Sequence, residues 1–506
     1  MILWNVIIVC SFLIIVLIIF FFSLYKKENI NYYIAGSGLS WPYIGISIIA
    51  ANISTEHFIG MSGSGYENGM AIASHEWTAA IALIIISLYI LPKFMSAGIK
   101  TLPEYLEYRF NHWVRLTVAI LMLIFIIFIQ FASIIYGGAL AMKIIFDVDL
   151  FLGMFVLSLL SLLFTSWARL STIAQTNVVF VATFILGGSW ITLKGIHYIG
   201  GIEKFVAYSD DKLKSLLPID NDFMPWTSAL LGGLWVAQFF YFGFNQFITQ
   251  YLLSGKSLSD AQKGILLAAS LKLFVPFIVI IPGIIAFEIT QIKPHDNDLV
   301  YPMLIDFLAK FHFEIKGIVF CILLSAAISS LNSMSIAAAN IFINDIYIRF
   351  FRNITEKDKS TVKKYVIVII VFISSIWAPF IAKFHDSFEY MQKFAGMISP
   401  GITAVYILGL YNRKTTSLSA LLILGINPIL YLGTINFYPS ISFYNVIGIN
   451  FLILIVISWL LSILFPEKNP KTVHEKYEIK FERNLLVVIW SIFLTTMIFF
   501  LYTLFE

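Results

Sequence analysis

Apolar residues occur in long blocks along the chain, separated by short polar segments, and they neither alternate with period two nor keep to one helix face. A helix needs roughly 20 apolar residues to cross a bilayer, so the pattern predicts about fourteen membrane-spanning helices. Their expected ranges are 2–25, 41–64, 70–95, 114–146, 149–167, 171–195, 226–253, 258–290, 315–350, 363–384, 387–411, 416–437, 442–465 and 485–505.

The composition excludes a soluble protein. Of the 506 residues, 59% are hydrophobic and 12% are charged, and the mean hydropathy is +0.88, which soluble chains of this length do not reach. The longest loop, 196–225, is too short for a soluble domain. Cys10 and Cys321 both lie in apolar blocks, which argues against a disulfide framework or a cysteine-ligated metal. The expected fold class is therefore an all-α polytopic membrane protein.

Basic residues concentrate in alternate loops. The stretches 93–115, 349–364 and 468–483 hold many of the 33 lysines and arginines. Because cytoplasmic loops are enriched in these residues, both termini are predicted to be extracytoplasmic, in a plasma membrane such as the bacterial inner membrane. Residues 2–25 have no basic residue before them and no small-residue cleavage site after them, so we expect a retained first span rather than a signal peptide.

The second predicted span carries a polar segment where the bilayer interior favours apolar residues. The stretch AANISTEHFIGMSGSG, residues 50–65, places Asn52, Ser54, Glu56 and His57 close together, with glycines after them. Irregular backbone is tolerated at membrane depth only where it lines a cavity or is buried in protein, and discontinuous helices hold sodium in secondary transporters. We therefore expect an unwound helix with a cation site. A continuous helix whose polar side chains serve packing is the alternative.

Charged and amide side chains in other spans indicate a polar ligand. Glu76 lies in ASHEWTAA and Lys272 in AASLKLFVPF, at depths where charge is rare unless it is functional or paired. A structural ion pair between them, with no ligand role, is the alternative. Gln130, Gln238 and Gln392 lie in apolar spans, and each alone is more often a packing group. Together these groups and a histidine supply the donors and acceptors that a neutral polyhydroxylated ligand requires.

The ninth predicted span contains SAAISSLNSMS, in which Ala326, Ser329 and Ser330 fall at positions i, i+3 and i+4. These residues share one helix face. A carbonyl and two hydroxyls on that face suit sodium, a hard cation that prefers oxygen ligands. Small residues at this spacing also mediate helix packing, so the face indicates sodium binding only in combination with the broken second span.

Several long motifs resemble one family. They are AANISTEHFIGMSGSGYENG, IASHEW, TLPEYLEYRF, GFNQFITQYLL, AQKGILLAA and FAGMISPGI. In this order, over residues 30 to 415, they resemble the sodium/solute symporter family and, within it, the sodium/glucose and sodium/galactose cotransporter branch. The resemblance implies a core of two inverted five-helix repeats with a broken first core helix. The implied division is 1–40 for a leading helix and cytoplasmic linker, 41–195 and 226–411 for the repeats, 196–225 for an extracytoplasmic loop, and 412–506 for three peripheral helices.

The resemblance also implies roles for individual residues. Sodium would be held by Ala50, Ile53, Ala326, Ser329 and Ser330. Sugar contacts would come from Asn52, His57, Glu76, Gln130, Gln238, Lys272 and Gln392. Tyr241 matches an aromatic residue that stacks on the sugar and closes the inner gate, and an outer hydrophobic gate is matched by Met61, His75 and Phe388.

The sequence departs from the family pattern at positions that affect the function. His57 replaces the glutamine of the bacterial galactose symporter but agrees with the histidine of the animal glucose cotransporters, so a sugar remains the expected substrate. Asn177 stands where the family usually has an aspartate, which weakens any claim for a second cation or proton site.

The predicted function is sodium-coupled symport of a glucose- or galactose-like monosaccharide by alternating access. Sodium would be the coupling ion, and no enzyme activity, nucleic-acid partner or obligate protein partner is expected. Two alternatives stay open: symport of another solute, such as a sialic acid, inositol or an amino acid, and a sugar-gated membrane sensor.

Overall fold

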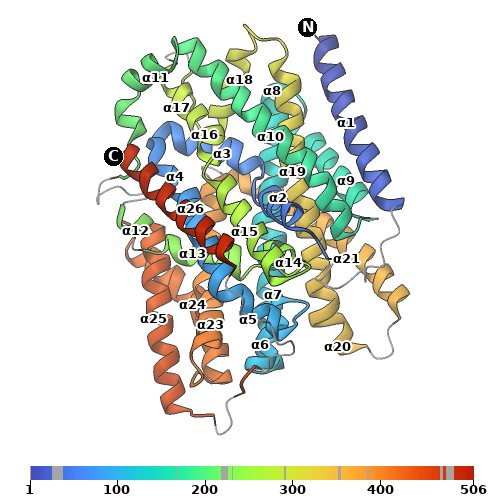
Figure 1. The fold of residues 1–506 in the computed structure, drawn as a ribbon, viewed down its shortest axis with the longest axis vertical. Coiled ribbons are helices and arrows are strands. Elements are labelled where there is room, and N and C mark those ends of the chain that lie inside the picture. Colours follow the sequence, from blue (N-terminus) through green and yellow to red (C-terminus); the bar gives the residue numbers. More distant parts are fainter. Residues whose placement is uncertain are drawn as a thin grey trace.

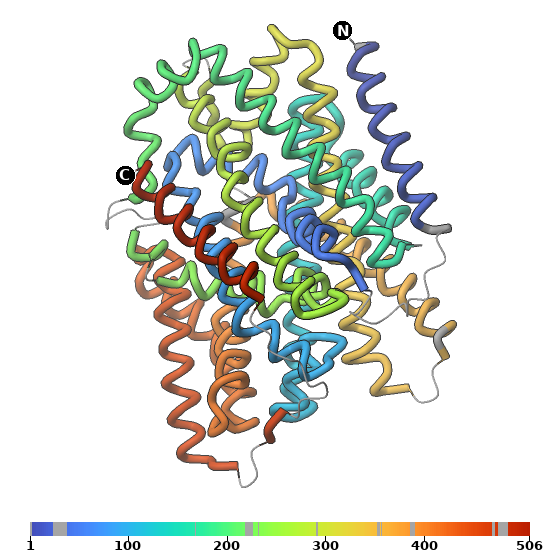
Figure 2. Tube along the Cα trace, viewed as in Figure 1, coloured from blue at the N-terminus to red at the C-terminus, as the bar shows by residue number. Residues whose placement is uncertain are grey.

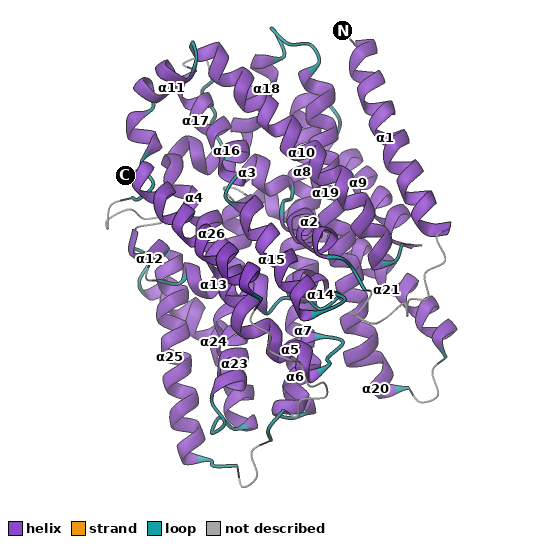
Figure 3. Ribbon diagram, viewed as in Figure 1, coloured by secondary structure: helices purple, strands orange, loops and turns teal. Residues whose placement is uncertain are grey.

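Helices make up almost all of the structure (Figures 1 and 3). The computed structural model describes residues 2–25, 38–166, 168–217, 226–230, 232–289, 292–351, 355–384, 387–467, 471–473 and 484–505. Within these ranges no β-strand forms, and the extended backbone pairs only at an isolated bridge between Leu39 and Gly255. The prediction of an all-α membrane fold is confirmed.

The α-helices of the first half of the chain are α1 (Ile2–Tyr25), α2 (Trp41–Asn52), α3 (Thr55–Asn68), α4 (Ala73–Ile85), α5 (Leu91–Ala97), α6 (Leu102–Arg109), α7 (His112–Ile124), α8 (Ala132–Phe146), α9 (Leu150–Ser166), α10 (Leu170–Ile199), α11 (Ile202–Tyr208), α12 (Trp226–Leu230), α13 (Leu234–Gly243) and α14 (Gln246–Leu252). The second half contains α15 (Leu258–Lys272), α16 (Val275–Val279), α17 (Ile281–Glu288), α18 (Val300–Leu308), α19 (Ile315–Ile341), α20 (Ile348–Phe350), α21 (Glu356–Trp377), α22 (Ser387–Gly396), α23 (Ser399–Tyr411), α24 (Ser417–Phe437), α25 (Phe443–Leu464) and α26 (Leu485–Leu504). Shorter 3₁₀ or π segments are η1 (Gly69–Ile72), η2 (Ile86–Ile90), η3 (Phe125–Phe131), η4 (Asp210–Leu213), η5 (Asn297–Leu299), η6 (Phe342–Tyr347) and η7 (Ala378–Lys383).

Each of the predicted spans has a helical counterpart, although fewer helices qualify as spans by length and apolarity. In the described part of the chain 9 helices are long and apolar enough, or up to 12 if each bent pair of helices is one span. Two features explain the difference from the sequence prediction. The helix α9 has 17 residues and falls short of the length criterion, and the second and third predicted spans share one helical stretch, Thr55–Ala97, preceded by α2.

The centre of the bundle is built from helices that are distant in sequence. The helix α2 packs against α15 and α10, and α10 packs against α19. Figure 2 shows the α2 segment, near the start of the chain, beside α15 from its middle. The helices α1 and α25 stand at opposite edges of the bundle in Figure 1. Because α2 and α19 are in the centre, the polar segment after α2 is enclosed by protein rather than lipid, as irregular backbone requires.

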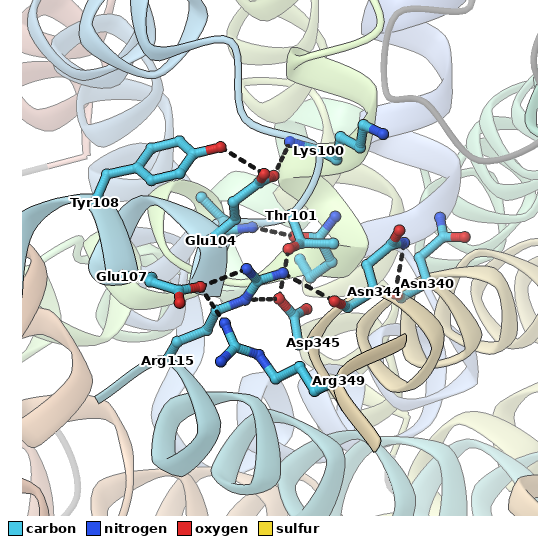
Figure 4. Close-up of polar contacts among 12 residues, drawn as sticks. Lys100, Thr101, Glu104, Glu107, Tyr108, Arg115, Asn340, Asn344, Asp345 and Arg349 are labelled. Atoms are coloured by element: carbon cyan, nitrogen blue, oxygen red, sulfur yellow. Dashed lines mark hydrogen bonds and ion pairs between the residues drawn. The ribbon is translucent and has the colours of Figure 1, made fainter. Parts of the chain in front are cut away.

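A charged cluster joins the loop helix α6 to α7, η6 and α20 (Figure 4). Arg115 donates from Nε to Asp345 at 2.5 Å and from Nη1 to Glu107 at 2.7 Å. Thr101 also donates to Asp345, at 2.9 Å, and Arg349 pairs with Glu107. Partial burial acts to raise the pKa of Glu107, but hydrogen bonds from Arg349 and Arg115 outweigh it and leave that pKa below its ordinary value. Glu107 therefore contributes stability at neutral pH that is lost as the pH falls through its lowered pKa.

Asp345→Ala is expected to lower the thermal unfolding midpoint by several degrees. Asp345 is fully buried, so the substitution leaves the Arg115 guanidinium short of a partner, a change that costs about 3–5 kcal/mol in buried pairs. The matched control is Asp306→Ala. Asp306 pairs with Lys316 at 2.8 Å, but its side chain is 55% exposed, and exposed pairs contribute about 0–1 kcal/mol. Equal shifts in the two variants would contradict a stabilising role for the cluster.

Candidate functional site

The second predicted span is broken, as the sequence predicts. The helix α2 ends at Asn52 and α3 begins at Thr55, and the two residues between them are extended, with φ −74° and ψ 113° at Ile53 and φ −119° and ψ −177° at Ser54. The Ser54 N–H donates to Nδ1 of His57 at 3.3 Å. In a continuous helix that N–H would bond the Ala50 carbonyl. The His57 side chain therefore holds the break open and leaves the Ala50 carbonyl available.

Oxygen atoms from both sides of the break converge on α19. The Ser330 hydroxyl lies 3.3 Å from the Ala50 carbonyl oxygen and 3.2 Å from that of Ile53. On the preceding residue, the Ser329 hydroxyl donates to the carbonyl of Ala326, one turn earlier in α19, at 3.2 Å. All five residues of the predicted sodium site are fully buried here. The Ser330 hydroxyl has one proton and can donate it to only one of the Ala50 and Ile53 carbonyls at a time. The set of neutral oxygens therefore has more acceptors than protons, which suits a hard cation.

A cavity lies beside the break, and most of the predicted sugar and gate residues line it. Its volume is about 30 Å³, room for about two water molecules at 10–15 Å³ each. The lining residues are Asn52, His57, His75, Phe125, Ala237, Gln238, Phe240, Tyr241, Phe242, Met391, Gln392, Ala395 and Ser399. None of the described residues that line this cavity is an aspartate, glutamate, lysine or arginine.

Hydrogen bonds fix several lining side chains. Gln392 Nε2 and His75 Nε2 are 3.0 Å apart, and Gln238 donates to the His75 carbonyl at 2.8 Å. The Tyr241 ring contacts Phe247 edge-on, with centroids 5.2 Å apart. Its hydroxyl faces Asn52 and Gln130, although neither amide atom of Gln130 makes a hydrogen bond of standard geometry. The amides of Gln238 and Gln392 thus line the same cavity as Tyr241, and Gln130 lies at the Tyr241 hydroxyl.

Glu76 and Lys272 form a buried ion pair behind the cavity wall. Lys272 Nζ lies 2.5 Å from Glu76 Oε2, and the two side chains are 1% and 0% exposed. The other carboxylate oxygen of Glu76 lies 3.7 Å from His57 Nε2 and 3.6 Å from His75 Nδ1. The ion pair that the sequence offered as the alternative to a ligand role is therefore present. Two histidines that line the cavity, His57 and His75, lie between the pair and the cavity. A direct sugar contact for either residue stays a prediction.

Two predicted gate residues are not among the lining residues. Met61 is fully buried in α3, and the side chain of Phe388 is outside what the structure describes. Sequence reasoning missed the aromatic wall formed by Phe125, Phe240 and Phe242. The run FFYFGFNQ was a signal for the last two, because they flank Tyr241 immediately before the break between α13 and α14.

Comparison with known proteins identifies the family. The family model described as Sodium:solute symporter family matches residues 32–426. The chain belongs to this family. It is 39% identical over 424 residues to the sodium/glucose cotransporter of Vibrio parahaemolyticus, covering 78% of each chain, and 28% identical over 474 residues to the uncharacterized symporter YidK of Escherichia coli (strain K12), covering 88% of this chain and 81% of the other. A solved structure of a Na+-coupled sialic acid symporter superposes with a TM-score of 0.81 at 20% identity, over 92% of this chain and 99% of that one, which shows a shared fold. This family member is thus a multi-pass membrane transporter with sodium as its coupling ion.

Ser330→Ala and Ser329→Ala are each expected to raise the sodium concentration for half-maximal transport or binding, because each removes a hydroxyl from the oxygen cluster. Sodium dependence of thermal stability or of substrate uptake measures this. The control is Ser335→Ala on the same helix, a buried serine whose hydroxyl bonds to no described residue. Unchanged sodium activation in both test variants would remove the sodium site from α19.

Glu76→Gln and Lys272→Met are each expected to destabilise the protein, and the double variant is expected to recover most of the loss. Each single change leaves an uncompensated buried charge, which costs about 3–5 kcal/mol, whereas removing both charges is often neutral or stabilising. Thermal unfolding of the three variants measures the coupling between the two sites. Strictly additive losses would show that the contact does not stabilise the fold.

Proposed function

We propose that the protein is a sodium-coupled symporter of a neutral, glucose- or galactose-like monosaccharide that works by alternating access. The observation that carries this is the chemistry of the cavity wall. Amides, histidines and a tyrosine ring supply hydrogen bonds and an aromatic face, while the nearby charges of Glu76 and Lys272 neutralise each other. Such a wall suits a ligand that carries many hydroxyls and no net charge. The similarity to a sodium/glucose cotransporter over 78% of the chain supports the same substrate class.

Sodium and sugar would be coupled through the broken helix. Asn52 and His57 line the cavity, and Ala50 and Ile53 present their carbonyls to the oxygen cluster in the same stretch of backbone. A cation bound to those carbonyls fixes the break and thereby positions both sugar-binding side chains. By thermodynamic linkage the sugar then strengthens sodium binding by the same factor.

The driving force is sufficient for concentrative uptake. One sodium ion crossing 100 mV contributes about 2.3 kcal/mol, and a tenfold sodium gradient contributes about 1.4 kcal/mol more. Together they permit several-hundred-fold accumulation of a neutral solute. A monosaccharide does not fit the cavity of about 30 Å³, so loading requires the wall to open. Tyr241 and Gln392, which face the cavity from α13 and α22, are the groups that we expect to move.

The division into two inverted repeats is supported by the broken helices. The first repeat, 41–195, begins with α2 and α3 and their break at Ile53 and Ser54. The second repeat, 226–411, begins with α12 to α14, which are interrupted at Phe244 and Asn245. A break near the start of each repeat is the arrangement of transporters with inverted repeats.

The proposed orientation places both termini outside the cytoplasm, in the plasma membrane. Near the N-terminus, Asn5 donates to the Phe313 carbonyl at 2.9 Å. Near the C-terminus, Ser215 donates its N–H to the Phe505 carbonyl at 2.6 Å. The partners Phe313 and Ser215 belong to loops that charge patterning assigns to the extracytoplasmic side, so these contacts support a common side for the two ends.

Other functions are less well supported by the site. A sialic acid or an amino acid carries a carboxylate, and the described cavity wall offers no lysine or arginine to pair with it. Inositol, which is neutral and polyhydroxylated, fits the same chemistry and is the strongest competing substrate. A sensor would bind the sugar without concentrating it. We propose no enzymatic role and no obligate protein partner, with sugar, sodium and the lipid bilayer as the interacting species.

The test is uptake of labelled glucose, galactose and inositol into proteoliposomes, with an inward sodium gradient or with choline in its place. We expect sodium-dependent accumulation of one of the monosaccharides. Tyr241→Phe keeps the aromatic surface and is expected to retain substantial uptake, whereas Tyr241→Ala is expected to lose most of it. Preferential uptake of inositol, or sugar binding without accumulation, would overturn the proposal.

The same assay shows whether Glu76 and Lys272 contact the sugar. If they are ligands, a stable Glu76→Gln, Lys272→Met double variant binds the sugar roughly tenfold more weakly or worse, because charge-assisted hydrogen bonds contribute about 1.5–3 kcal/mol each. Wild-type affinity in that variant would leave the pair structural.

A further inference from the structure

A second, larger cavity lies at the end of the bundle that charge patterning assigns to the cytoplasm. Its volume is about 220 Å³, and four basic residues line it, Lys93, Arg109, Arg413 and Lys471. They come from α5, from α6, from the loop after α23 and from the segment 471–473. The fold thus collects four cations from distant parts of the sequence around one space. The cavity is separate from the sugar and sodium sites and shares no lining residue with the first cavity.

Two of the four cations are held in place by the fold. Arg109 is 3% exposed, and its Nη2 donates to the carbonyls of Asn412, Arg413 and Thr415 at 2.9, 3.0 and 3.1 Å. Lys93 donates to the Leu410 carbonyl at 3.0 Å and lies 3.5 Å above the centre of the Tyr411 ring. These bonds fix the end of α23 and the loop that carries Arg413, so the wall is preorganised and is not a set of loose surface side chains.

Among the described residues that line the cavity, the basic side chains have no acidic counterpart. The nearby Glu467 interacts electrostatically with Arg109, but its carboxylate is hydrogen-bonded to the N–H and the hydroxyl of Ser417 rather than to the basic residues of the wall. Burial lowers the pKa of Arg109, and its Nη1 has no hydrogen-bond partner among the residues that the structure describes. Like charges gathered at a partly desolvated site favour a bound anion.

We propose that this cavity binds a phosphate-bearing anion. Arginine and lysine are the side chains that bind phosphate through charge-assisted hydrogen bonds, and the cavity adds hydroxyl groups from Tyr105 and Thr472. The phosphate can belong to an anionic phospholipid headgroup, since basic pockets between helices on the cytoplasmic side bind such headgroups, or to a soluble phosphate. The motif TLPEYLEYRF contributes Tyr105 and Arg109 to the cavity wall, so phosphate binding gives this motif a function.

The test compares two charge-removing double variants of the full-length protein. Arg413→Gln with Lys471→Gln removes two cations from the wall, and both residues are exposed, so the bonds made by Lys93 and Arg109 remain. The control, Lys414→Gln with Lys357→Gln, removes two exposed cations from the same predicted face of the protein without touching the cavity. Thermal unfolding is measured in neutral detergent with added inorganic phosphate, and in nanodiscs of phosphatidylcholine with or without phosphatidylglycerol.

The wild type and the control are expected to unfold at a higher temperature when the phosphate-bearing species is present. The Arg413, Lys471 variant is expected to need a roughly tenfold or higher concentration of it for the same rise, because each basic residue strengthens binding to an anionic surface by a factor of about five. Stabilisation by phosphatidylglycerol alone identifies a lipid headgroup. Stabilisation by inorganic phosphate in the absence of anionic lipid identifies a soluble phosphate. Equal responses of the two double variants, or no response of the wild type to either probe, would overturn the proposal.

Discussion

The two-residue break between α2 and α3 is the constraint on which the central site depends. Backbone groups inside a bilayer must find partners within the protein, and the Ile53 carbonyl and the Ser54 N–H give up their helical hydrogen bonds in the middle of the bundle. The structure satisfies them with side chains: His57 accepts the Ser54 N–H, and the Ser330 hydroxyl on α19 lies within hydrogen-bond distance of the carbonyls of Ala50 and Ile53. The Thr55 hydroxyl donates to the Ile134 carbonyl at 3.1 Å and ties the start of α3 to α8. The oxygen cluster therefore depends on how α19 lies against the break.

His57 connects this junction to the charged pair. Its Nδ1 accepts from the backbone, which places the ring proton on Nε2, the nitrogen that faces Glu76 at 3.7 Å. Glu76 is held by Lys272 in turn. The tautomer follows from the hydrogen bond rather than from an observed proton. His57 thus lies between the ion pair and the break: it accepts the Ser54 N–H on one side and lies beside the Glu76 carboxylate on the other.

The sequence was sufficient for the helical fold and the broken span, because these depend on apolar run length and on polar groups that have no other place in a bilayer. The meeting of α2 with α19 was implied by the family resemblance. The sequence did not distinguish a ligand-binding Glu76 and Lys272 from a buried pair, since both readings require the same two residues at the same depth. It also missed Phe125, Phe240 and Phe242 in the cavity wall. In a chain with 47 phenylalanines the only local signal was the position of Phe240 and Phe242 beside Tyr241, and Phe125 lies in an apolar run that carries no such signal.

The shared backbone of the two sites has a consequence for how the two ligands affect each other's binding. A ligand that fixes the break also positions Asn52 and His57, because only a few residues separate them from the carbonyls of Ala50 and Ile53. When sodium binds first, part of the free energy needed to order the sugar site comes from sodium binding. The sugar then binds to side chains that are already in position. If sugar binds first, it must order the same segment without the cation, and its apparent affinity falls by the fraction of molecules in the competent state. The same cost falls on sodium when it binds without the sugar, so the two ligands stabilise each other reciprocally through the segment that carries His57.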